Sequence, residues 1–281
     1  MSGTLYMVAT PIGNLEDMSY RAVRILGEVD LIAAEDTRNS IKLLNHFEIK
    51  KPLTSYHEFN RYDKADILVD KLEQGMNIAV ITDAGTPGIS DPGEVLVEMC
   101  IERGIAVVPV PGAVAGINAL IASGQSTRRF VFEGFIPQDK KERAEVLERM
   151  AEETRTIIVY EAPHRLAKTL KVLADCLGGD RSITICKELT KKHEGFLKTS
   201  IAEALNLYES EEPKGEYVLV IAGRSKEEIL DEKKAMWENV PVREHLLKYI
   251  NDGVSKKDAI KLVAEERGVS KKEIYKESID L

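Results

Sequence analysis

The chain has 281 residues, of which 43% are hydrophobic and 31% are charged, and its formal net charge is −8. This composition excludes an intrinsically disordered chain, because it provides enough apolar side chains for a large core. The length allows two compact domains, or one large domain with an appendage. An acidic chain has no general attraction for nucleic acid, so any such binding has to come from a local basic region.

Short runs rich in valine and isoleucine recur through the first 222 residues, and each is too short for a buried helix. They predict strands at residues 5–9, 30–34, 78–82, 106–110, 130–133, 156–160, 183–186 and 217–222. Helix-like stretches lie between many of these runs, at residues 63–74, 94–103, 140–153 and 164–177. The alternation of strand and helix predicts an α/β fold with mainly parallel sheets.

Two changes in composition predict the domain boundaries. The small polar segment ASGQSTRR at residues 122–129 separates two α/β runs, and no strand pattern remains beyond Gly223. We therefore expect an N-terminal α/β domain at residues 1–124, a second α/β domain at residues 125–225 and a helical module at residues 226–281.

The helical module carries helix-boundary signals and a local basic charge. Pro241 suits the first position of a helix (N1), Ser255 and Ser270 suit N-caps, and Gly253 and Gly268 suit helix stops. Residues 255–276 contain seven basic and four acidic side chains, a local net charge of +3. We expect phosphate contacts from lysines that share a helix face, namely Lys257, Lys261, Lys272 and Lys276.

A helix-turn-helix pattern covers part of the same module. Ala264, Gly268 and Ile274 have the spacing of that motif, and Val263 and Val269 would be its core neighbours. Glu277 falls where such motifs prefer an apolar residue, so the match is partial. The alternative is a small helical appendage that serves only dimer or domain packing.

Cysteine and histidine usage gives no sign of a disulfide framework or a metal site. Cys100, Cys176 and Cys186 form no CxxC pair and are interpreted as core thiols in a reducing compartment. The histidines show no ligand spacing, so we expect no metal. Pro11 and Gly13 interrupt any signal-peptide core, and the apolar runs are too short to span a membrane. These features predict a soluble, cytoplasmic protein without a membrane partner.

The predicted strands of the first half are followed by turns rich in proline and glycine. The turns are TPIGN at 10–14, EDTR at 35–38, DAGTPGISDPG at 83–93 and PGA at 111–113. Ligands bind beyond the carboxyl ends of parallel strands, and such turns let a ligand approach bare backbone. Each could be a plain turn, with Asp91 capping the next helix, but together they predict a binding crevice. The GxGxxG and GxxxxGK[ST] motifs are absent, which excludes the usual dinucleotide and P-loop sites.

These motifs resemble the tetrapyrrole methylase family. The resemblance is carried by LYMVATPIGNLEDMSYRAVRIL at 5–26, AAEDTR at 33–38, ITDAGTPGISDPG at 81–93 and PVPGAVAGINAL at 109–120. Later stretches continue it in the same order: FVFEGFIP at 130–137, YEAPHRL at 160–166, KELTKKHE at 187–194 and KGEYVLVIAG at 214–223. Within the family they are most similar to the branch that methylates the 2′-hydroxyl of a cytidine in 16S ribosomal RNA.

The resemblance implies two α/β domains with S-adenosylmethionine in the cleft between them, and a homodimer. The donor contacts that it implies are Pro11, Gly85, Thr86, Pro87, Ile89, Ser90, Val114, Ala115, Tyr160 and Glu161. Members that act on tetrapyrroles have GDP where this chain has Gly85-Thr86-Pro87, and they have serines near Ala113. That departure favours the RNA branch, with 16S ribosomal RNA in the small ribosomal subunit as the partner.

Methyl transfer to a ribose hydroxyl needs positioned reactants, and a general base or a cation would assist it. The catalytic candidates at strand ends are Glu35, Asp36, Lys187 and Glu188, and His57, Glu161 and His164 remain open beside them. Asp36 could instead cap a helix, and Lys187 and Glu188 could form a structural ion pair. Arg38 is expected to contact RNA, or else to be a solvated surface charge.

Two other functions remain open at this point. One is C-methylation of a tetrapyrrole precursor, which the basic module argues against because a small substrate needs no such module. The other is a non-enzymatic regulator with a ligand-sensing α/β domain and a helix-turn-helix. Methylation of ribosomal subunits would exclude both alternatives, whereas sequence-preferring binding of duplex DNA would favour the regulator.

Overall fold

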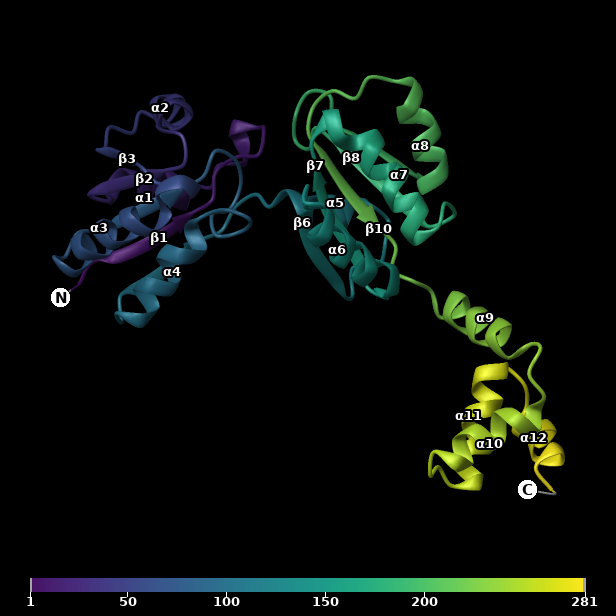
Figure 1. Cartoon of the computed structure of the whole chain (residues 1–281). Helices are drawn as coiled ribbons and strands as arrows, with labels where there is room; N and C mark the ends of the chain where they lie inside the picture. The colour runs from purple at the N-terminus through teal and green to yellow at the C-terminus, as the bar shows by residue number, and fades with distance from the viewer. Residues whose placement is uncertain (1, 280–281) are drawn as a thin grey trace. The chain divides into compact units, whose positions relative to one another are not determined.

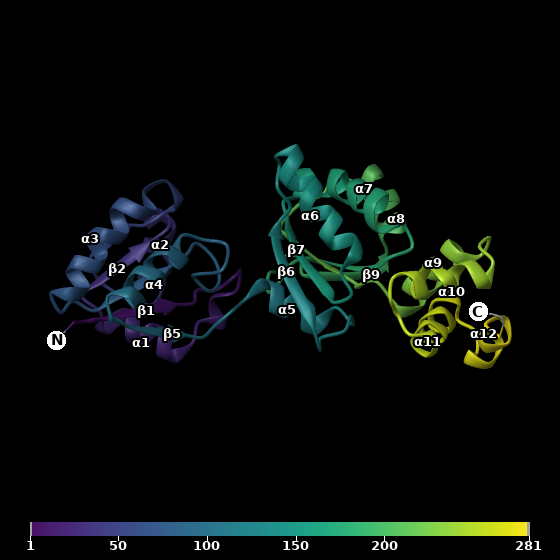
Figure 2. The same cartoon turned by 60° about the horizontal axis from the view of Figure 1, so that its bottom comes forward.

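The computed structural model describes residues 2–279. The chain divides into two compact units: Met1–Met150 with Thr156–Ala222, and Ala151–Arg155 with Gly223–Leu281. The first unit contains two five-stranded sheets and the second is helical (Figures 1 and 2). The α/β fold with a C-terminal helical module is therefore confirmed, whereas a division of the first unit at residue 124 stays a prediction.

The first sheet is entirely parallel, with the strand order β3-β2-β4-β1-β5. Its strands are β1 (Thr4–Val8), β2 (Leu31–Ala34), β3 (Leu53–Ser55), β4 (Ile78–Ile81) and β5 (Ala106–Val110). β2 and β4 are buried along their whole length, as expected for strands covered on both faces. The three-residue β3 was not expected, because it is too short to show a strand pattern.

Helices cover both faces of this sheet. On one face, α3 (Arg61–Glu73) and α4 (Gly93–Glu102) bury Leu68 and Leu96 against β1 and β4. On the other face, α1 (Tyr20–Glu28) and α2 (Thr37–His46) bury Leu26 and Leu44 against Ile32. The neighbouring strands β1 and β4 thus send their following helices to opposite faces. This is the topological switch point, where the carboxyl edge of such a sheet opens into a crevice.

The second sheet has the order β6-β7-β10-β8-β9 and is mixed. Its strands are β6 (Phe130–Phe135), β7 (Thr156–Glu161), β8 (Ser182–Lys187), β9 (Gly195–Ser200) and β10 (Tyr217–Ile221). Only β6 and β7 pair in parallel, so the expectation of mainly parallel sheets is wrong for this half. The reason is that β8 and β9 form a hairpin and β10 inserts antiparallel between β7 and β8. β9 was not expected, because it is a half-exposed edge strand.

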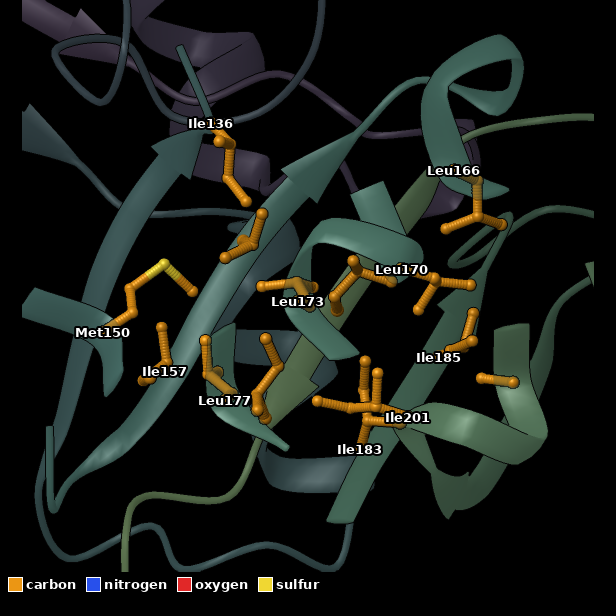
Figure 3. Packing of buried hydrophobic residues seen from close by; sticks show 14 of the residues in the cluster. Ile136, Met150, Ile157, Leu166, Leu170, Leu173, Leu177, Ile183, Ile185 and Ile201 are labelled. Carbon is orange, nitrogen blue, oxygen red and sulfur yellow. The ribbon is translucent and has the colours of Figure 1, made fainter. Parts of the chain in front are cut away.

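The core of the second sheet lies mainly under three helices. α6 (Lys140–Glu152), α7 (Leu166–Leu177) and α8 (Ile201–Ser210) cover one face, and α5 (Ala115–Ala122) packs against β7 and β10 on the other. Figure 3 shows Leu170 and Leu173 of α7 pointing at the strands that carry Ile157 and Ile185. Each fully buried leucine of this kind contributes about 1.5–3 kcal/mol through the removal of apolar surface from water.

The helical module consists of α9 (Lys226–Trp237), α10 (Val242–Asn251), α11 (Lys256–Arg267) and α12 (Lys271–Glu277). Ser255 and Ser270 are N-caps and Gly268 is a left-handed C-cap, as predicted. Leu246, Val263 and Ile274 form the small core between the last three helices. Val269 is 41% exposed, so its expected core position is wrong; it lies in the turn directly after Gly268.

Three short 3₁₀ helices complete the described elements: η1 (Leu15–Asp17), η2 (Glu58–Asn60) and η3 (Pro163–Arg165). Cys100 and Cys186 are buried, but Cys176 is exposed on α7, which corrects the expectation of three core thiols. Among residues 2–279, no helix has both the length and the apolar character needed to cross a membrane.

Candidate functional site

The proline- and glycine-bearing turns of the first sheet meet at its carboxyl edge. Thr10, after β1, and Gly85, after β4, form a two-way backbone bridge, with N···O distances of 2.8 and 3.2 Å. The Thr86 hydroxyl donates to the carbonyl of Ala113, after β5, at 3.0 Å. Three turns that are far apart in the sequence are therefore held together at the switch point.

The loop at residues 83–93 has a fixed backbone path. The carboxylate of Asp91 accepts hydrogen bonds from the amides of Gly88, Ile89 and Gly93 at 2.8–3.0 Å. Gly85 has a φ of +88°, and Ser90 holds a left-handed conformation with a φ of +61°. A non-glycine residue in that region costs energy and persists only where its surroundings hold it in place. Asp91 thus organises the loop itself rather than only capping α4.

A pocket of about 330 Å³ lies against these turns. We call it the strand-end pocket, and its lining residues are Ile12, Ala84, Gly85, Thr86, Ile89, Val114, Ala115, Phe135, Tyr160, Glu161, Ala162, Pro163, Leu189, Glu216, Tyr217 and Val218. Both sheets contribute to it, and most of the lining side chains are apolar. Its size and character are those of a site for one small organic molecule.

Most residues that the family resemblance implied for donor contact lie around this pocket. Gly85, Thr86, Ile89, Val114, Ala115, Tyr160 and Glu161 line it. Pro11, Pro87 and Ser90 lie outside the lining set but directly follow or precede lining residues in the chain. The sequence reasoning missed the contribution of the second sheet from Phe135, Leu189 and the segment 216–218. Those residues fall inside the motifs FVFEGFIP, KELTKKHE and KGEYVLVIAG, so a signal was present.

Tyr160 joins the two halves of the pocket wall. Its hydroxyl accepts a hydrogen bond of 2.9 Å from the amide of Gly116, in the first turn of α5. Its ring makes edge-to-face contacts with Phe132 and Phe135, at centroid distances of 4.9 and 5.7 Å. Burial raises the pKa of the Tyr160 hydroxyl, so it stays neutral and acts as a wall and an anchor.

Glu161 is occupied by structural contacts. Its side chain is fully buried, accepts a hydrogen bond of 2.5 Å from the Thr169 hydroxyl and lies 3.3 Å from the Arg165 guanidinium. The amide of Ala162 also donates to it. Glu161 therefore ties the end of β7 to the start of α7. His164 lies in η3, where the chain enters that helix.

Glu35 and Asp36 follow β2 but have different surroundings. Asp36 caps α2, and the Arg38 guanidinium beside it lowers the pKa of this carboxyl to about 2. Glu35 is half-buried and accepts a hydrogen bond of 3.3 Å from the amide of Asp83, next to the pocket residue Ala84. Burial, together with the nearby Asp83 carboxylate, raises the pKa of Glu35. Of these two acids, Glu35 is better suited to accept a proton near neutral pH.

Lys187 is the last residue of β8, and Glu188 follows it directly. Lys187 pairs in register with the pocket residue Tyr217. Glu188 has a φ of +51° and accepts from the amide of Glu216 at 2.8 Å and from Lys191 Nζ at 3.0 Å. Burial alone would raise the pKa of Glu188, but these hydrogen bonds and the lysine charge hold it below its usual value. The structure thus ties Glu188 into an ion-pair network and leaves Lys187 at the strand end.

The predicted RNA contacts lie in several places. Arg38 is exposed and paired with Asp36 in the first unit. In the helical module, Lys257, Lys261 and Lys272 share one hollow between α11 and α12. Lys276 lies in a different hollow, with Glu273 and Glu277. His57 lies beside Glu35; its backbone amide bonds to Asn60. No group of three His, Cys, Asp or Glu side chains suited to a metal occurs among residues 2–279.

Comparison with known proteins identifies the family. A family model described as Tetrapyrrole (Corrin/Porphyrin) Methylases matches residues 4–205. A Synechocystis sp. protein named ribosomal RNA small subunit methyltransferase I is 49% identical over 279 residues, covering 99% of this chain and 98% of that protein. The protein of the same name from Halalkalibacterium halodurans is 48% identical over 273 residues, covering 97% of this chain and 93% of its own.

Solved structures support the same fold. Uroporphyrin-III C-methyl transferase from Thermus thermophilus, complexed with S-adenyl homocysteine, has a TM-score of 0.55 at 15% identity and covers 78% of this chain and 97% of its own. The chain therefore belongs to the tetrapyrrole methylase family and, within it, to the group named ribosomal RNA small subunit methyltransferase I.

Proposed function

We propose that this protein transfers a methyl group from S-adenosylmethionine to the 2′-hydroxyl of a cytidine in 16S ribosomal RNA. The observation that carries the proposal is similarity of 48–49% over nearly the whole chain to proteins named for small-subunit ribosomal RNA methylation. The turn Gly85-Thr86-Pro87, in place of the GDP of members that act on tetrapyrroles, supports an RNA rather than a porphyrin acceptor.

The strand-end pocket fits the methyl donor. A Cβ at Gly85 would meet Ile12 Cγ2 at 3.3 Å and the Ala113 carbonyl at 3.5 Å, so glycine lets the turns after β1, β4 and β5 pack closely at the pocket. Apolar side chains such as Ile89, Val114 and Leu189 suit an adenine ring. The aromatic walls Tyr160 and Phe135 suit a sulfonium cation, because cations are attracted to ring faces. When bound, the donor supplies an activated methyl group.

The residues of this chain then have three roles in the proposal. The bridged turns at Thr10, Gly85 and Ala113 hold the donor in a fixed orientation, which lowers the entropic cost of bringing the reactants together. Glu35, next to the pocket rim, accepts the proton of the ribose hydroxyl. Lys187, at the end of β8 and paired with the pocket residue Tyr217, stabilises the developing alkoxide. Asp36 and Glu188 remain candidates whose ion pairs suit them to positioning.

The partner in this proposal is 16S ribosomal RNA within the small ribosomal subunit in the cytoplasm, held by the helical module. We also propose three domains, at residues 1–124, 125–225 and 226–281, and a homodimer. Support for the homodimer comes from apolar side chains on α5 and the edge strand β6, where Ile121 is 68% exposed and Phe130 is 39% exposed. Burying such side chains against a second copy would remove them from water.

The decisive experiment incubates the protein with labelled S-adenosylmethionine and small ribosomal subunits that lack the modification. We expect label at a single cytidine, resistant to alkaline hydrolysis, because a 2′-O-methyl group blocks attack on the adjacent phosphate. In a parallel incubation with a corrinoid precursor in place of the subunits, transfer of label to that precursor alone would establish the tetrapyrrole reaction. Absence of transfer together with sequence-preferring binding of duplex DNA would make the protein a regulator.

A further inference from the structure

The helical module carries an open hollow of about 660 Å³ between α11 and α12. We call it the lysine groove, and its lining residues are Lys256, Lys257, Asp258, Ile260, Lys261, Lys271, Lys272 and Tyr275. Five lysines face one carboxylate, and the Tyr275 side chain beside them is 59% exposed. The groove thus joins a dense positive charge to an accessible aromatic ring.

The lysines of the groove are placed against the preference of their own helices. Lys257 and Lys272 lie in the first turns of α11 and α12, where the helix dipole disfavours a positive charge. Lys257 and Lys261 are four residues apart, a spacing at which like charges repel. In the described part of the chain, no carboxylate lies within salt-bridge distance of Lys257, Lys261, Lys271 or Lys272. These four ammonium groups therefore make no salt bridge among the described residues and are available to an external polyanion.

The choice of lysine rather than arginine indicates which part of a nucleic acid the groove contacts. Arg267 is the one arginine in residues 255–276. Its guanidinium is occupied, donating to His245 Nδ1 at 3.2 Å and to the Val240 carbonyl at 2.5 Å. Base edges are read mainly by planar, bidentate groups, whereas lysine ammonium groups act as point charges for phosphates. The groove thus has the chemistry of a backbone site that tolerates different sequences.

The exposed ring of Tyr275 favours a single strand over a duplex. The major groove of an RNA duplex is deep and narrow, so side chains cannot read the bases there. An exposed tyrosine ring beside phosphate-binding lysines is the usual platform for stacking an unpaired base.

We propose that the lysine groove binds the phosphodiester backbone of a single-stranded RNA segment and stacks one unpaired base on Tyr275. The inference rests on the proposed function in taking RNA as the partner, and it deepens that function by specifying the form of the RNA. The proposal leaves Lys276 out of the phosphate-binding lysines, because Lys276 lies in another hollow beside Glu273 and Glu277.

The test measures binding of a fluorescent polyuridine oligomer to the full-length protein over a series of salt concentrations, without methyl donor. The triple variant Lys257→Gln, Lys261→Gln, Lys272→Gln should lower the slope of log affinity against log salt by about 2, since each lost phosphate contact removes about 0.7. The matched control Lys276→Gln should keep the wild-type slope. All of these side chains are exposed, and circular dichroism checks that the variants fold.

Substitution of the aromatic ring separates stacking from charge. Tyr275→Ala should weaken polyuridine binding about tenfold with an unchanged salt slope, because stacking involves no counterion release. Tyr275→Phe should bind as the wild type does. An unchanged slope in the triple variant, or duplex RNA that binds as tightly as the single strand, would overturn the proposal.

Because donor and subunits are absent from this assay, its result is independent of the proposed methylation. If the variants lose salt slope and stacking as expected but the wild-type protein transfers no methyl group, the groove is established and the proposed function is refuted. Wild-type slopes in every variant of an enzyme that methylates subunits would refute the groove alone.

Discussion

The strand-end pocket and the lysine groove are built from different materials. The pocket is lined largely by backbone and apolar side chains, and its turns are fixed by the Thr10–Gly85 bridge and by the amides that surround Asp91. The groove is open and consists of long, exposed lysines around a single tyrosine. The pocket thus has a fixed shape, whereas the charge of the groove is carried by long, exposed side chains.

This difference matches two kinds of ligand. A donor whose methyl group must be aligned for in-line transfer needs rigid contacts that are fixed before it binds. A polyanion that must be caught, but not read, needs point charges that can adjust to any phosphate in reach. The two regions should therefore respond differently to substitution: the pocket through geometry and proton transfer, and the groove through charge and salt.

The largest effect is expected at Glu35. Glu35→Gln should lower the rate of methyl transfer by about 10²–10⁴-fold with little change in donor affinity, since a positioned general base contributes about that much. The proton acceptor has to be the carboxylate, so the wild-type rate should fall as pH decreases through the raised pKa of Glu35. This decrease of the rate at low pH, the acid limb of the rate–pH profile, should occur at a higher pH than it would for an ordinary glutamate. It should be absent from the Glu35→Gln variant. A rate–pH profile of single turnovers measures both.

Asp36→Asn is the matched control for Glu35. Asp36 is the adjacent acid, but its pKa is about 2 because Arg38 pairs with it. The control should retain the acid limb and lose only a small part of the rate. A control variant without the acid limb, or a Glu35→Gln enzyme of wild-type rate, would remove Glu35 from the mechanism.

The next effect concerns the backbone of the pocket. Gly85→Val should lower donor affinity by about tenfold or more, because a branched side chain closes the approach to the backbone and disfavours the left-handed conformation. Gly104→Val is the control, since Gly104 has a φ of +66° and a Cβ at that position would meet no other atom within 4 Å. Both variants should lose about 1–3 kcal/mol of stability from backbone strain. Only Gly85→Val should weaken donor binding in calorimetry; equal affinities would show that the loop is a plain turn.

The sequence predicted the strands and turns around the strand-end pocket well where local signals are strong. The buried strands β2 and β4 are continuous apolar runs, and the turns after β1, β4 and β5 carry proline and glycine that mark their positions. The order of the motifs along the chain, through the family resemblance, then indicated a donor site in a cleft. The pairing of strands was harder to foresee, because an edge strand such as β9 has weak alternation and the insertion of β10 depends on contacts across the whole second sheet.

Side-chain roles were less predictable because neighbours in space decide them. Glu35, Asp36 and Glu188 look alike in the sequence as strand-end acids. Their differences come from Arg38, two residues along the chain, and from Lys191 and the Glu216 amide, which the β8–β10 pairing brings together. In the module, helical periodicity paired Lys276 with Lys272, whereas in the structure Lys276 lines a different hollow, together with Glu273 and Glu277.

A third effect tests the independence of the two regions. Deletion of residues 226–281 should leave donor affinity unchanged, because every residue that lines the pocket lies in the first unit. RNA affinity at moderate salt should fall by about tenfold or more, since the phosphate contacts of the groove are lost. Donor calorimetry and RNA binding on the same preparation provide the comparison. A truncated protein that no longer binds donor would show that the module supports the pocket.

The smallest effect is a pH response confined to the module. His245 is buried and stacks on Trp237 with a centroid distance of 3.5 Å. Its Nε2 lies 2.9 Å from a Glu266 carboxylate oxygen, and its Nδ1 accepts from Arg267. A nitrogen that accepts from a guanidinium has no proton of its own, so the buried imidazole is neutral. Burial, together with the Arg267 and Lys248 charges, lowers the pKa of His245 despite the Glu266 carboxylate.

The sign of the effect follows from linkage. A histidine with a lowered pKa in the folded state binds its proton more readily when unfolded, so its contribution is complete above the ordinary value of 6.5 and is lost as pH falls below it. Trp237 is the chain's single tryptophan and lies on this imidazole, so its fluorescence reports urea unfolding of the module. We therefore expect the free energy of unfolding of the module to decrease as pH falls from 7.5 to 5.5. His245→Gln should flatten this dependence, and a wild-type midpoint that is constant or rises on acidification would contradict a neutral, buried His245.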